Sequence, residues 1–346
     1  MTPSFTLADL GWASDFLRQL DLQELAATPC RIAAVHRSRV EALSAAGPLS
    51  LTPPSGVSTG EIAVGDWALC DGTRLLRLLD RRSSLSRRAA GTGAARQLIA
   101  ANVDTLFVVT SCNADFNPAR LERYLALAHS AGVEAVILLT KADLAPDPEA
   151  WRAQAKAVDR RVAVQLIDAT APEVAVSLAD WCRKGQTVAL AGSSGVGKTT
   201  LANALTGAAE ATAPIRDDDA KGRHTTTGRH LRPITGGGWL IDTPGMRELR
   251  LTDAKDGIAT VFDDIDALAR ACRFANCLHL QEPGCAVQAA LTDGRLDPGR
   301  LARWEKLRRE DRHNSATLAE AHARDRAFGR MVREVLRDKN RRRGDS

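Results

Sequence analysis

The sequence lacks long apolar runs and is poor in aromatic residues. None of its 346 residues belongs to an apolar stretch near the roughly 20 residues that span a bilayer, so we expect no membrane helix. Residues 1–20 also lack the basic start and apolar block of a secretory signal, which favours a cytoplasmic protein. Because only 4% of residues are aromatic, nucleic-acid binding would depend on basic side chains rather than on base stacking.

Cysteine is also scarce and unevenly placed. The chain has seven cysteines, an odd number, and three of them fall between Cys272 and Cys285, unlike a secreted disulfide framework. These three, Cys272, Cys277 and Cys285, form C-x4-C-x-H-x5-C together with His279, a set that can close a tetrahedron around zinc. No carboxylate belongs to the set, which indicates one structural rather than catalytic zinc ion. The alternative is three buried cysteines beside an unrelated histidine; the other four cysteines are expected in the core.

Positive charge is concentrated at the C-terminus. The net charge is +5, and residues 300–346 contain 15 Lys or Arg against 8 Asp or Glu, so the rest of the chain is slightly acidic. A tail ending in Lys339 and three arginines at 341–343 can neutralise phosphates, which favours nucleic acid as a partner. A solvated helix with a frayed basic end is an equally good interpretation.

Hydrophobic patterning divides the chain into four segments and predicts a multidomain α/β protein. Residues 1–29 form a short helical lead, and residues 30–95 show the short apolar alternations and turns of a small β-barrel. Residues 96–255 alternate strands with helices, and their continuous apolar strands predict a largely parallel sheet between two helical layers. Residues 256–346 are helical, first cysteine-bearing and then basic.

A phosphate-binding loop, G-x-x-x-x-G-K-[ST], lies between a predicted strand at 187–191 and a predicted helix. Its backbone N–H groups would face phosphates, Lys198 would reach the β- and γ-phosphates, and Thr199 would ligate magnesium. The strand and helix disfavour the alternative, a glycine-rich turn with an incidental lysine. The loop alone does not indicate whether the nucleotide is ATP or GTP, or whether the protein is a kinase or a hydrolase. It comprises Gly192, Ser193, Ser194, Gly195, Val196, Gly197, Lys198 and Thr199, followed by Thr200.

A base-reading segment follows the apolar strand at 133–139 and consists of Thr140, Lys141, Ala142 and Asp143. Asp143 can accept both the N1–H and the exocyclic amine of guanine, a donor pair that adenine lacks, and the stem of Lys141 can lie along the ring. The segment is similar to the N-K-x-D element of GTPases, with Thr140 offering fewer hydrogen bonds than Asn. A further base contact is expected from the backbone N–H of Ala169, in a loop that starts at Asp168.

The D-x-x-G element of GTPases is matched by residues 242–245. Asp242 would hold magnesium through water, and the Gly245 N–H would sense the γ-phosphate. The preceding threonine-rich loop should supply another magnesium ligand, and the sequence does not separate Thr226 from Thr227.

Met246 stands where many GTPases place a water-orienting glutamine, and its side chain offers no useful hydrogen bond. His224 is the nearest substitute, since its pKa suits proton handling near neutral pH. This catalytic role is a hypothesis, and a surface histidine in a flexible loop is the equally weighted alternative.

The order of these motifs resembles the circularly permuted ribosome small-subunit-dependent GTPase A family. TKAD, GSSGVGKTT, GRHTTT, DTPGMRE and the zinc set occur in that order, with the base-reading segment before the phosphate loop, and the resemblance covers about residues 31–307. It implies an N-terminal OB-like β-barrel, a circularly permuted P-loop GTPase core and a C-terminal helical zinc-binding domain.

The resemblance also implies a function. GTP would be hydrolysed to GDP and phosphate, with magnesium, during late maturation of the small (30S) ribosomal subunit, which would stimulate the reaction and offer its rRNA to the barrel and zinc domain. We expect a monomer. Two alternatives stay open: a P-loop kinase or ATPase, which would not need Asp143, and a non-catalytic RNA-binding scaffold, which Met246 allows.

Overall fold

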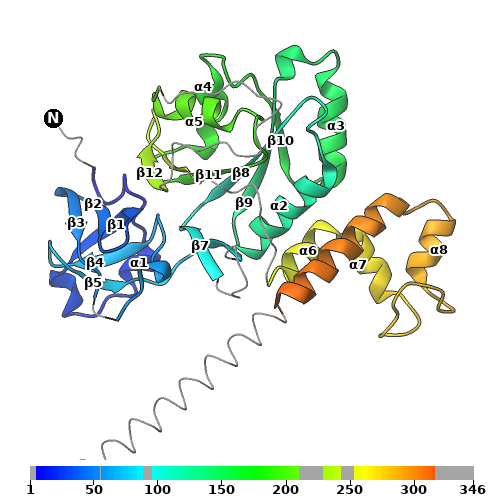
Figure 1. Cartoon of the computed structure of the whole chain (residues 1–346), viewed down its shortest axis with the longest axis horizontal. Coiled ribbons are helices and arrows are strands. Elements are labelled where there is room, and N and C mark those ends of the chain that lie inside the picture. Colours follow the sequence, from blue (N-terminus) through cyan, green and yellow to red (C-terminus); the bar gives the residue numbers. More distant parts are fainter. Residues whose placement is uncertain (1–4, 55, 89–95, 210–228, 243–252, 316–346) are drawn as a thin grey trace, which may run out of the picture.

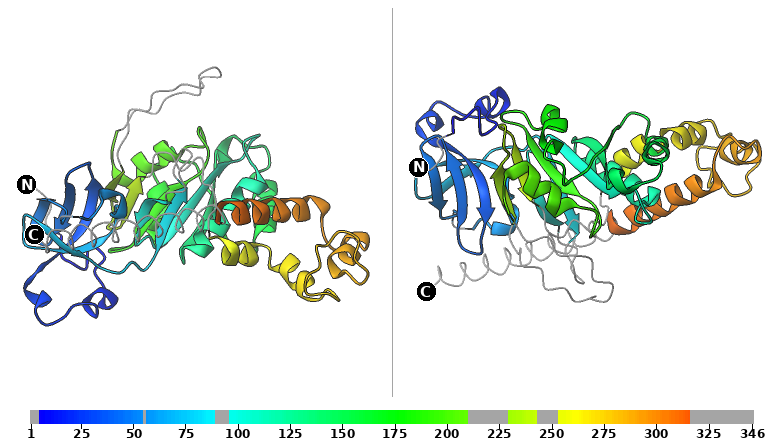
Figure 2. Two further views of the ribbon diagram at one scale, coloured as in Figure 1. Left: turned by 60° about the horizontal axis from the view of Figure 1, so that its bottom comes forward. Right: turned by 90° about the horizontal axis from the view of Figure 1, so that it is seen from above.

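The computed structural model describes residues 5–54, 56–88, 96–209, 229–242 and 253–315. They form an elongated molecule with a β-barrel at one end, a central sheet flanked by helices, and a helical part at the other end (Figures 1 and 2). Within these ranges, no helix is both long enough and apolar enough to cross a membrane.

Five N-terminal strands form a small antiparallel unit where the sequence predicts a β-barrel. β1 pairs with both β2 and β4, β2 pairs with β3, and β4 pairs with β5, all antiparallel. A parallel bridge between Thr52 and Arg74 brings the end of β3 to the start of β5 and partly closes the ring. The strands are β1 (Thr28–Val35), β2 (Val40–Ser44), β3 (Gly47–Leu51), β4 (Trp67–Cys70) and β5 (Leu75–Leu78).

The central sheet has the predicted parallel character. Its order is β10-β9-β8-β11-β13, all parallel, with β12 added antiparallel to β13. β12 also pairs with β1 through Ala34 and His230, so barrel and sheet are continuous. The strands are β8 (Thr105–Ser111), β9 (Glu134–Thr140), β10 (Ala163–Leu166), β11 (Thr187–Ala191), β12 (His230–Pro233) and β13 (Trp239–Asp242).

Helices cover both faces of this sheet, because its apolar residues alternate between two cores. In β8, Leu106 and Val108 belong to the core under α2 (Pro118–Ser130) and α3 (Pro148–Val158). Phe107 and Val109 belong to the core under two other helices, α4 (Val174–Ser177) and α5 (Lys198–Thr206). Successive side chains of a strand point to opposite faces of the sheet, and helices bury both faces. This explains why the strands are continuously apolar in sequence.

The C-terminal helices are α6 (Lys255–Val261), α7 (Asp263–Arg270), α8 (Ala286–Thr292) and the helical residues 298–315. Of these, α6 and residues 298–315 pack on α2, while α7 packs on α6 and α8. Gly257 lets α6 approach α2 closely, since a Cβ there would collide with the carbonyl oxygen of Ala126. Its N–H also donates to Ser130 Oγ at 3.1 Å. The helical part therefore docks directly on the central part, as Figure 1 shows for α2 and α6.

The segment before β1 differs from the predicted helical lead. Its helical turns are α1 (Ser14–Leu17) and the 3-10 turn η1 (Glu24–Ala26), and the rest is irregular. Its aromatic side chains pack instead on two parts of the fold: Trp12 lies 4.9 Å from Trp67 of the barrel, and Phe5 lies 4.9 Å from Trp239 of the sheet. Because the segment runs along the junction between the barrel and the sheet, its apolar residues contact both parts and do not lie on one helical face. A hairpin of β6 (Ser84–Arg88) and β7 (Arg96–Ala101) then leads into the sheet.

Candidate nucleotide site and metal centre

The predicted nucleotide-binding segments meet at one edge of the sheet. The phosphate loop joins β11 to α5, the two base-reading segments follow β9 and β10, and Asp242 ends β13. All four strands are parallel neighbours of β8 or of each other, so their carboxyl ends share an edge. Ligands of open α/β sheets bind at this edge.

Glycines shape the phosphate loop. Gly192, Gly195 and Gly197 have φ angles of +147°, +78° and +94°, which other residues rarely adopt. A Cβ on Gly192 would also collide with the carbonyl oxygen of Val109 in β8. The loop therefore lies so close to the sheet that its first position requires glycine.

Some of the other loop residues anchor the loop to the protein, and others are exposed at its surface. Val196 is fully buried in the core beneath α5, which fixes the loop from below. The Lys198 ammonium donates a hydrogen bond to the Ser193 carbonyl, within the loop itself. Thr199 is exposed in the first turn of α5. The arrangement presents a lysine, a hydroxyl and the start of a helix to the same space, which suits an anion.

Thr140 ties the base-reading segment to the phosphate loop. Its buried hydroxyl lies 2.7 Å from the Val196 carbonyl oxygen and 3.1 Å from that of Thr110. The sequence predicted that threonine would link the base-reading segment to the phosphate loop more weakly than asparagine does. In the structure, the threonine hydroxyl still makes this link. The next residue, Lys141, has a φ of +56°, and Asp143 is exposed in the 3-10 turn η3 (Ala142–Leu144).

The second base-reading loop reaches the same point. A Cβ on Gly197 would lie 3.7 Å from Thr140 Cγ2 and 3.8 Å from Ala169 Cβ, so three loops converge there. Asp168 accepts hydrogen bonds from the N–H and hydroxyl of Thr170, at 2.8 and 2.6 Å, and these lower the pKa of its carboxyl. Asp168 thus shapes the turn that holds Ala169, which is nearly buried.

Tyr124 of α2 was not predicted from the sequence. It is 2% exposed and packs in the core between α2 and the sheet. Burial raises the pKa of its phenol, so the hydroxyl stays protonated at neutral pH. The one available signal was that this is the only tyrosine of the chain, on a helix next to the sheet.

Several predicted residues lie outside the described ranges. These are His224, Thr226, Thr227 and Gly245, together with Met246. Asp242 is described: it is half-buried and pairs with His230 in the β12–β13 register.

The four predicted metal ligands come together between α7 and α8. The ligand atoms of Cys272, Cys277, His279 and Cys285 all lie within 4.8 Å of one another. His279 Nδ1 is 3.6 Å from the sulfurs of both Cys272 and Cys285, which are 3.9 Å apart. Zn–S bonds of about 2.3 Å in a tetrahedron place two sulfurs roughly 3.8 Å apart, so the donor set fits zinc.

Local hydrogen bonds hold this loop in shape. His279 has a φ of +62°, and its carbonyl accepts a hydrogen bond from Gln288 Nε2 at 2.5 Å. Cys285 caps α8 by accepting the N–H of Gln288. The Glu282 carboxylate accepts the N–H groups of Leu278 and Leu280 at 2.7 and 2.8 Å. The remaining cysteines, Cys30, Cys70, Cys112 and Cys182, are buried, as predicted.

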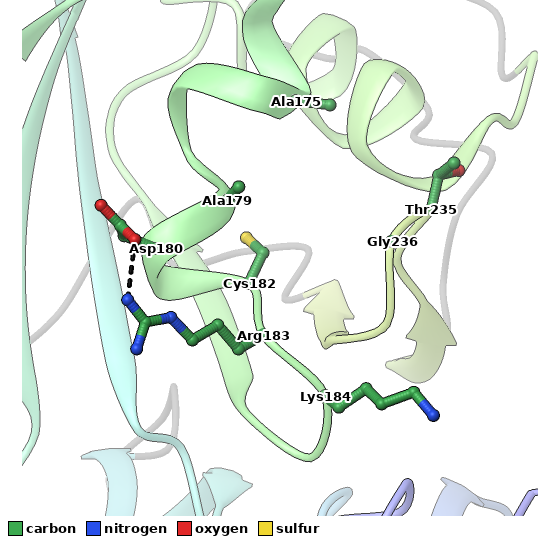
Figure 3. Close-up of a pocket in the computed structure, with 8 residues that line it drawn as sticks. All are labelled: Ala175, Ala179, Asp180, Cys182, Arg183, Lys184, Thr235 and Gly236. Carbon is green, nitrogen blue, oxygen red and sulfur yellow. Dashed lines mark hydrogen bonds and ion pairs between the residues drawn. The ribbon is translucent and has the colours of Figure 1, made fainter.

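The hollow drawn in Figure 3 is separate from both sites. It has a volume of about 370 Å³ and is lined by residues that precede β11, among them Cys182 and Lys184, and by Thr235 and Gly236 before β13. It therefore opens at the amino edge of the sheet, opposite the phosphate loop. Burial raises the pKa of the Cys182 thiol to about 12, which leaves it unreactive at neutral pH.

Comparisons with known proteins agree with this geometry. The sequence model of a family described as RsgA GTPase matches residues 78–252. The small ribosomal subunit biogenesis GTPase RsgA of Mesorhizobium japonicum is 56% identical over 316 residues, which are 90% of this chain and 91% of that protein. RsgA 2 of Vibrio parahaemolyticus, with the same description, is 47% identical over 345 residues, 99% of this chain and 96% of the relative.

Two solved structures share the fold. YjeQ from Thermotoga maritima matches with a TM-score of 0.60 at 21% identity, over 81% of this chain and 96% of its own. YloQ, described as a circularly permuted GTPase, matches with a TM-score of 0.58 at 22% identity, over 88% of this chain and 98% of its own.

Proposed function

Because the chain belongs to the RsgA GTPase family, and is therefore a GTP-hydrolysing enzyme, we propose that it acts in late maturation of the small ribosomal subunit. The names of the relatives from Mesorhizobium and Vibrio support this role. The observation that carries the proposal is the convergence of the phosphate loop and both base-reading loops at Gly197, in the permuted order.

In the proposed nucleotide site, guanine lies over the loops after β9 and β10. The exposed Asp143 accepts its N1–H and amine, Lys141 lies along the ring, and Ala169 contributes a backbone N–H. The phosphates lie on residues 192–200, where Lys198 would stabilise charge that develops on the γ-phosphate during hydrolysis.

Magnesium is the metal that P-loop GTPases use with the nucleotide. Thr199 and Asp242 follow the neighbouring parallel strands β11 and β13, so both oxygen donors stand at the same edge. Hydroxyl and carboxylate oxygens suit this ion. When bound, it neutralises phosphate charge; Thr199 and Asp242 hold and orient it.

Three residues outside the described ranges complete the proposed reaction site. Thr226 or Thr227 would add an oxygen ligand, Gly245 would contact the γ-phosphate, and His224 would orient the attacking water. Replacing His224 with alanine should lower the stimulated kcat without weakening GDP binding. An unchanged kcat would remove His224 from the mechanism.

The Cys3His cluster is proposed to bind one structural zinc ion. Its four donors leave no position for a substrate, and the ion would hold residues 272–285 in one conformation.

The proposed partner is the small ribosomal subunit with its rRNA. The barrel and the C-terminal helices project at opposite ends of the sheet, so both can touch one large surface (Figure 2). Exposed arginines such as Arg37 and Arg39, between β1 and β2, suit phosphate contacts. This role places the protein in the cytoplasm, and we propose that it works as a monomer.

GTP turnover with and without purified small subunits tests the proposal. Turnover should rise with subunits, and Lys198→Ala should reduce it roughly a hundredfold or more. Lys184→Ala is the matched control, since Lys184 lies at the opposite edge of the sheet, where its ammonium pairs with the half-buried Asp9 at 3.0 Å. An equal rate of GTP turnover with and without small subunits would contradict the ribosomal role. Equal displacement of labelled GDP by ATP and GTP would contradict the assignment of guanine.

A further inference from the structure

Asn113 follows β8 at the edge of the sheet where the proposed nucleotide site lies. β8 ends at Ser111, which is opposite Thr140 in the parallel β8–β9 register. The next residue, Cys112, donates its N–H to the Thr140 carbonyl at 2.9 Å, so the two chains stay side by side where the strands end. Asn113 is therefore one residue past a direct contact with the base-reading segment.

The turn after β8 fixes the side-chain amide of Asn113. Its Oδ1 accepts hydrogen bonds from the Ser111 hydroxyl at 2.8 Å and from the Asp115 N–H at 2.9 Å. Because a backbone N–H can only donate, the side-chain atom that faces Asp115 must be the amide oxygen. The Asn113 carbonyl also accepts the Phe116 N–H at 3.0 Å, and the Asn113 N–H donates to the Ser111 carbonyl at 2.8 Å. These contacts hold the residue in one orientation.

The Nδ2 group of Asn113 is left for another partner. Within the described ranges it has no protein acceptor, and it keeps contact with solvent because Asn113 is only partly buried. An amide nitrogen offers two N–H donors. The protein thus orients the amide through its oxygen and leaves its donors available to a ligand.

Thr140 has no donor to offer a base from the neighbouring strand. An asparagine at this position would have two N–H donors, whereas threonine has one O–H. The Thr140 hydroxyl lies 2.7 Å from the Val196 carbonyl oxygen and 3.1 Å from that of Thr110, so its one proton is used within the protein. The base site therefore lacks a side-chain donor at Thr140.

The strand order indicates which atom of guanine Asn113 would meet. Along the sheet the order is β10, β9, β8 and β11, so the residues that follow them are Ala169, Asp143, Asn113 and the phosphate loop, in turn. Guanine would present N1–H and its amine to Asp143, with O6 beside N1. Its other acceptor, N7, belongs to the ring that carries the ribose and the phosphates. N7 therefore lies on the side of the base that is nearer to β8 and β11.

We propose that Asn113 is a base-contacting residue, whose Nδ2 group donates a hydrogen bond to N7 of the bound guanine and supplies the donor that Thr140 lacks. The inference rests on the nucleotide site proposed above and adds a contact on an edge of the base that Asp143 does not reach. Adenine also has N7, so this contact adds affinity for a purine, and the discrimination against adenine stays with Asp143.

The first test compares GDP with 7-deaza-GDP, in which a C–H group replaces N7, on the wild-type protein. One hydrogen bond corresponds to roughly threefold to tenfold in Kd, so 7-deaza-GDP should bind more weakly by about this factor. Equal Kd values for the two nucleotides would overturn the proposal and leave the nucleotide site intact. Wild-type protein that binds neither nucleotide would refute the nucleotide site on which the inference rests.

Asn113→Asp separates the proposed contact from the turn. Aspartate keeps an oxygen for the Ser111 hydroxyl and the Asp115 N–H, but it has no N–H donor. The preference for GDP over 7-deaza-GDP should therefore disappear or reverse, since the second carboxylate oxygen repels the lone pair of N7. A preference that persists in this variant would assign N7 to another donor and reject the role of Asn113.

Asn117→Asp is the matched control on the same turn. Asn117 caps α2 by accepting the Arg120 N–H at 3.1 Å, and aspartate fills this role equally well. The control adds the same charge close to Asn113 and should keep the wild-type preference for GDP. Loss of the preference in both variants would attribute the effect to the added charge and would also overturn the proposal. If Asn113→Asp does not fold, the comparison of the two nucleotides on the wild-type protein still decides.

Discussion

Replacing Thr140 with valine removes one buried hydroxyl and almost nothing else. The hydroxyl proton can serve one acceptor fully at a time, and the Val196 carbonyl at 2.7 Å is closer than that of Thr110 at 3.1 Å. The loss is therefore about one hydrogen bond, with a buried carbonyl left without this donor. That costs about 1–3 kcal/mol in the free energy of unfolding.

The effect on nucleotide affinity should be smaller than the effect on stability. The Thr140 hydrogen bond exists before any nucleotide binds, so most of its loss falls on the free protein. Binding suffers only because the base-reading segment and the phosphate loop are no longer held together. We expect a roughly threefold to tenfold weaker Kd for GDP, about 0.7–1.4 kcal/mol.

Urea unfolding and titration with a fluorescent GDP analogue measure the two quantities. Thr170→Val is the matched control, since Thr170 is exposed and its hydroxyl donates only to the half-buried Asp168 two residues away, so its loss should change stability by less than about 0.5 kcal/mol. Thr140→Asn should keep the affinity, because an amide can also donate to the Val196 carbonyl. If Thr140→Val is as stable as the wild type and binds GDP equally well, the hydroxyl does not couple the two loops.

Three further predictions concern other parts of the fold. Removing metal with a chelator, or Cys285→Ser, should unfold residues 272–285 first, seen as faster hydrogen exchange there while GDP binding persists. Gly192→Ala should destabilise the protein by roughly 2–4 kcal/mol in urea unfolding, since the new methyl group meets the sheet backbone. Burial would raise the pKa of Asp159, but contacts with His129 and Arg161 hold it well below the ordinary 3.8. Its stabilisation is therefore present above pH 4 and is lost as the pH falls, so Asp159→Asn should be less stable than the wild type at pH 7 and should approach it near pH 2.

Local sequence patterns were sufficient to predict that the segments of the proposed nucleotide site come together. The strand at 187–191, the glycines of the phosphate loop and the apolar strand before Thr140 are each encoded within about ten residues. Parallel strands then bring their carboxyl ends together without further information. The metal ligands were predictable for the same reason, because all four lie within one short loop.

Contacts between distant positions were not predictable in this way. Arg31 lies in a strand, where the sequence suggests a solvent-facing side chain, yet it is 1% exposed. Its guanidinium donates to the Leu10 carbonyl and to Thr187 Oγ1, both at 2.6 Å, and so joins the N-terminal segment, the barrel and the sheet. Burial lowers the pKa of Arg31 to about 10, which still leaves it charged at neutral pH.

Circular permutation decides which parts of the chain border the nucleotide edge. Strands β8, β9 and β10 precede the phosphate loop. Among the described residues, no strand of the sheet therefore follows β13, which ends at Asp242. The next described helix, α6, packs on α2 through Gly257.

Asp242 and Gly192 stand on neighbouring parallel strands at the same edge. Asp242 leads to the C-terminal helices along the chain. In an unpermuted GTPase the segment after D-x-x-G returns to the sheet instead, because β8 would follow it. The permuted order therefore joins the C-terminal helices directly to the strand that ends at Asp242, on the proposed magnesium side of the nucleotide site.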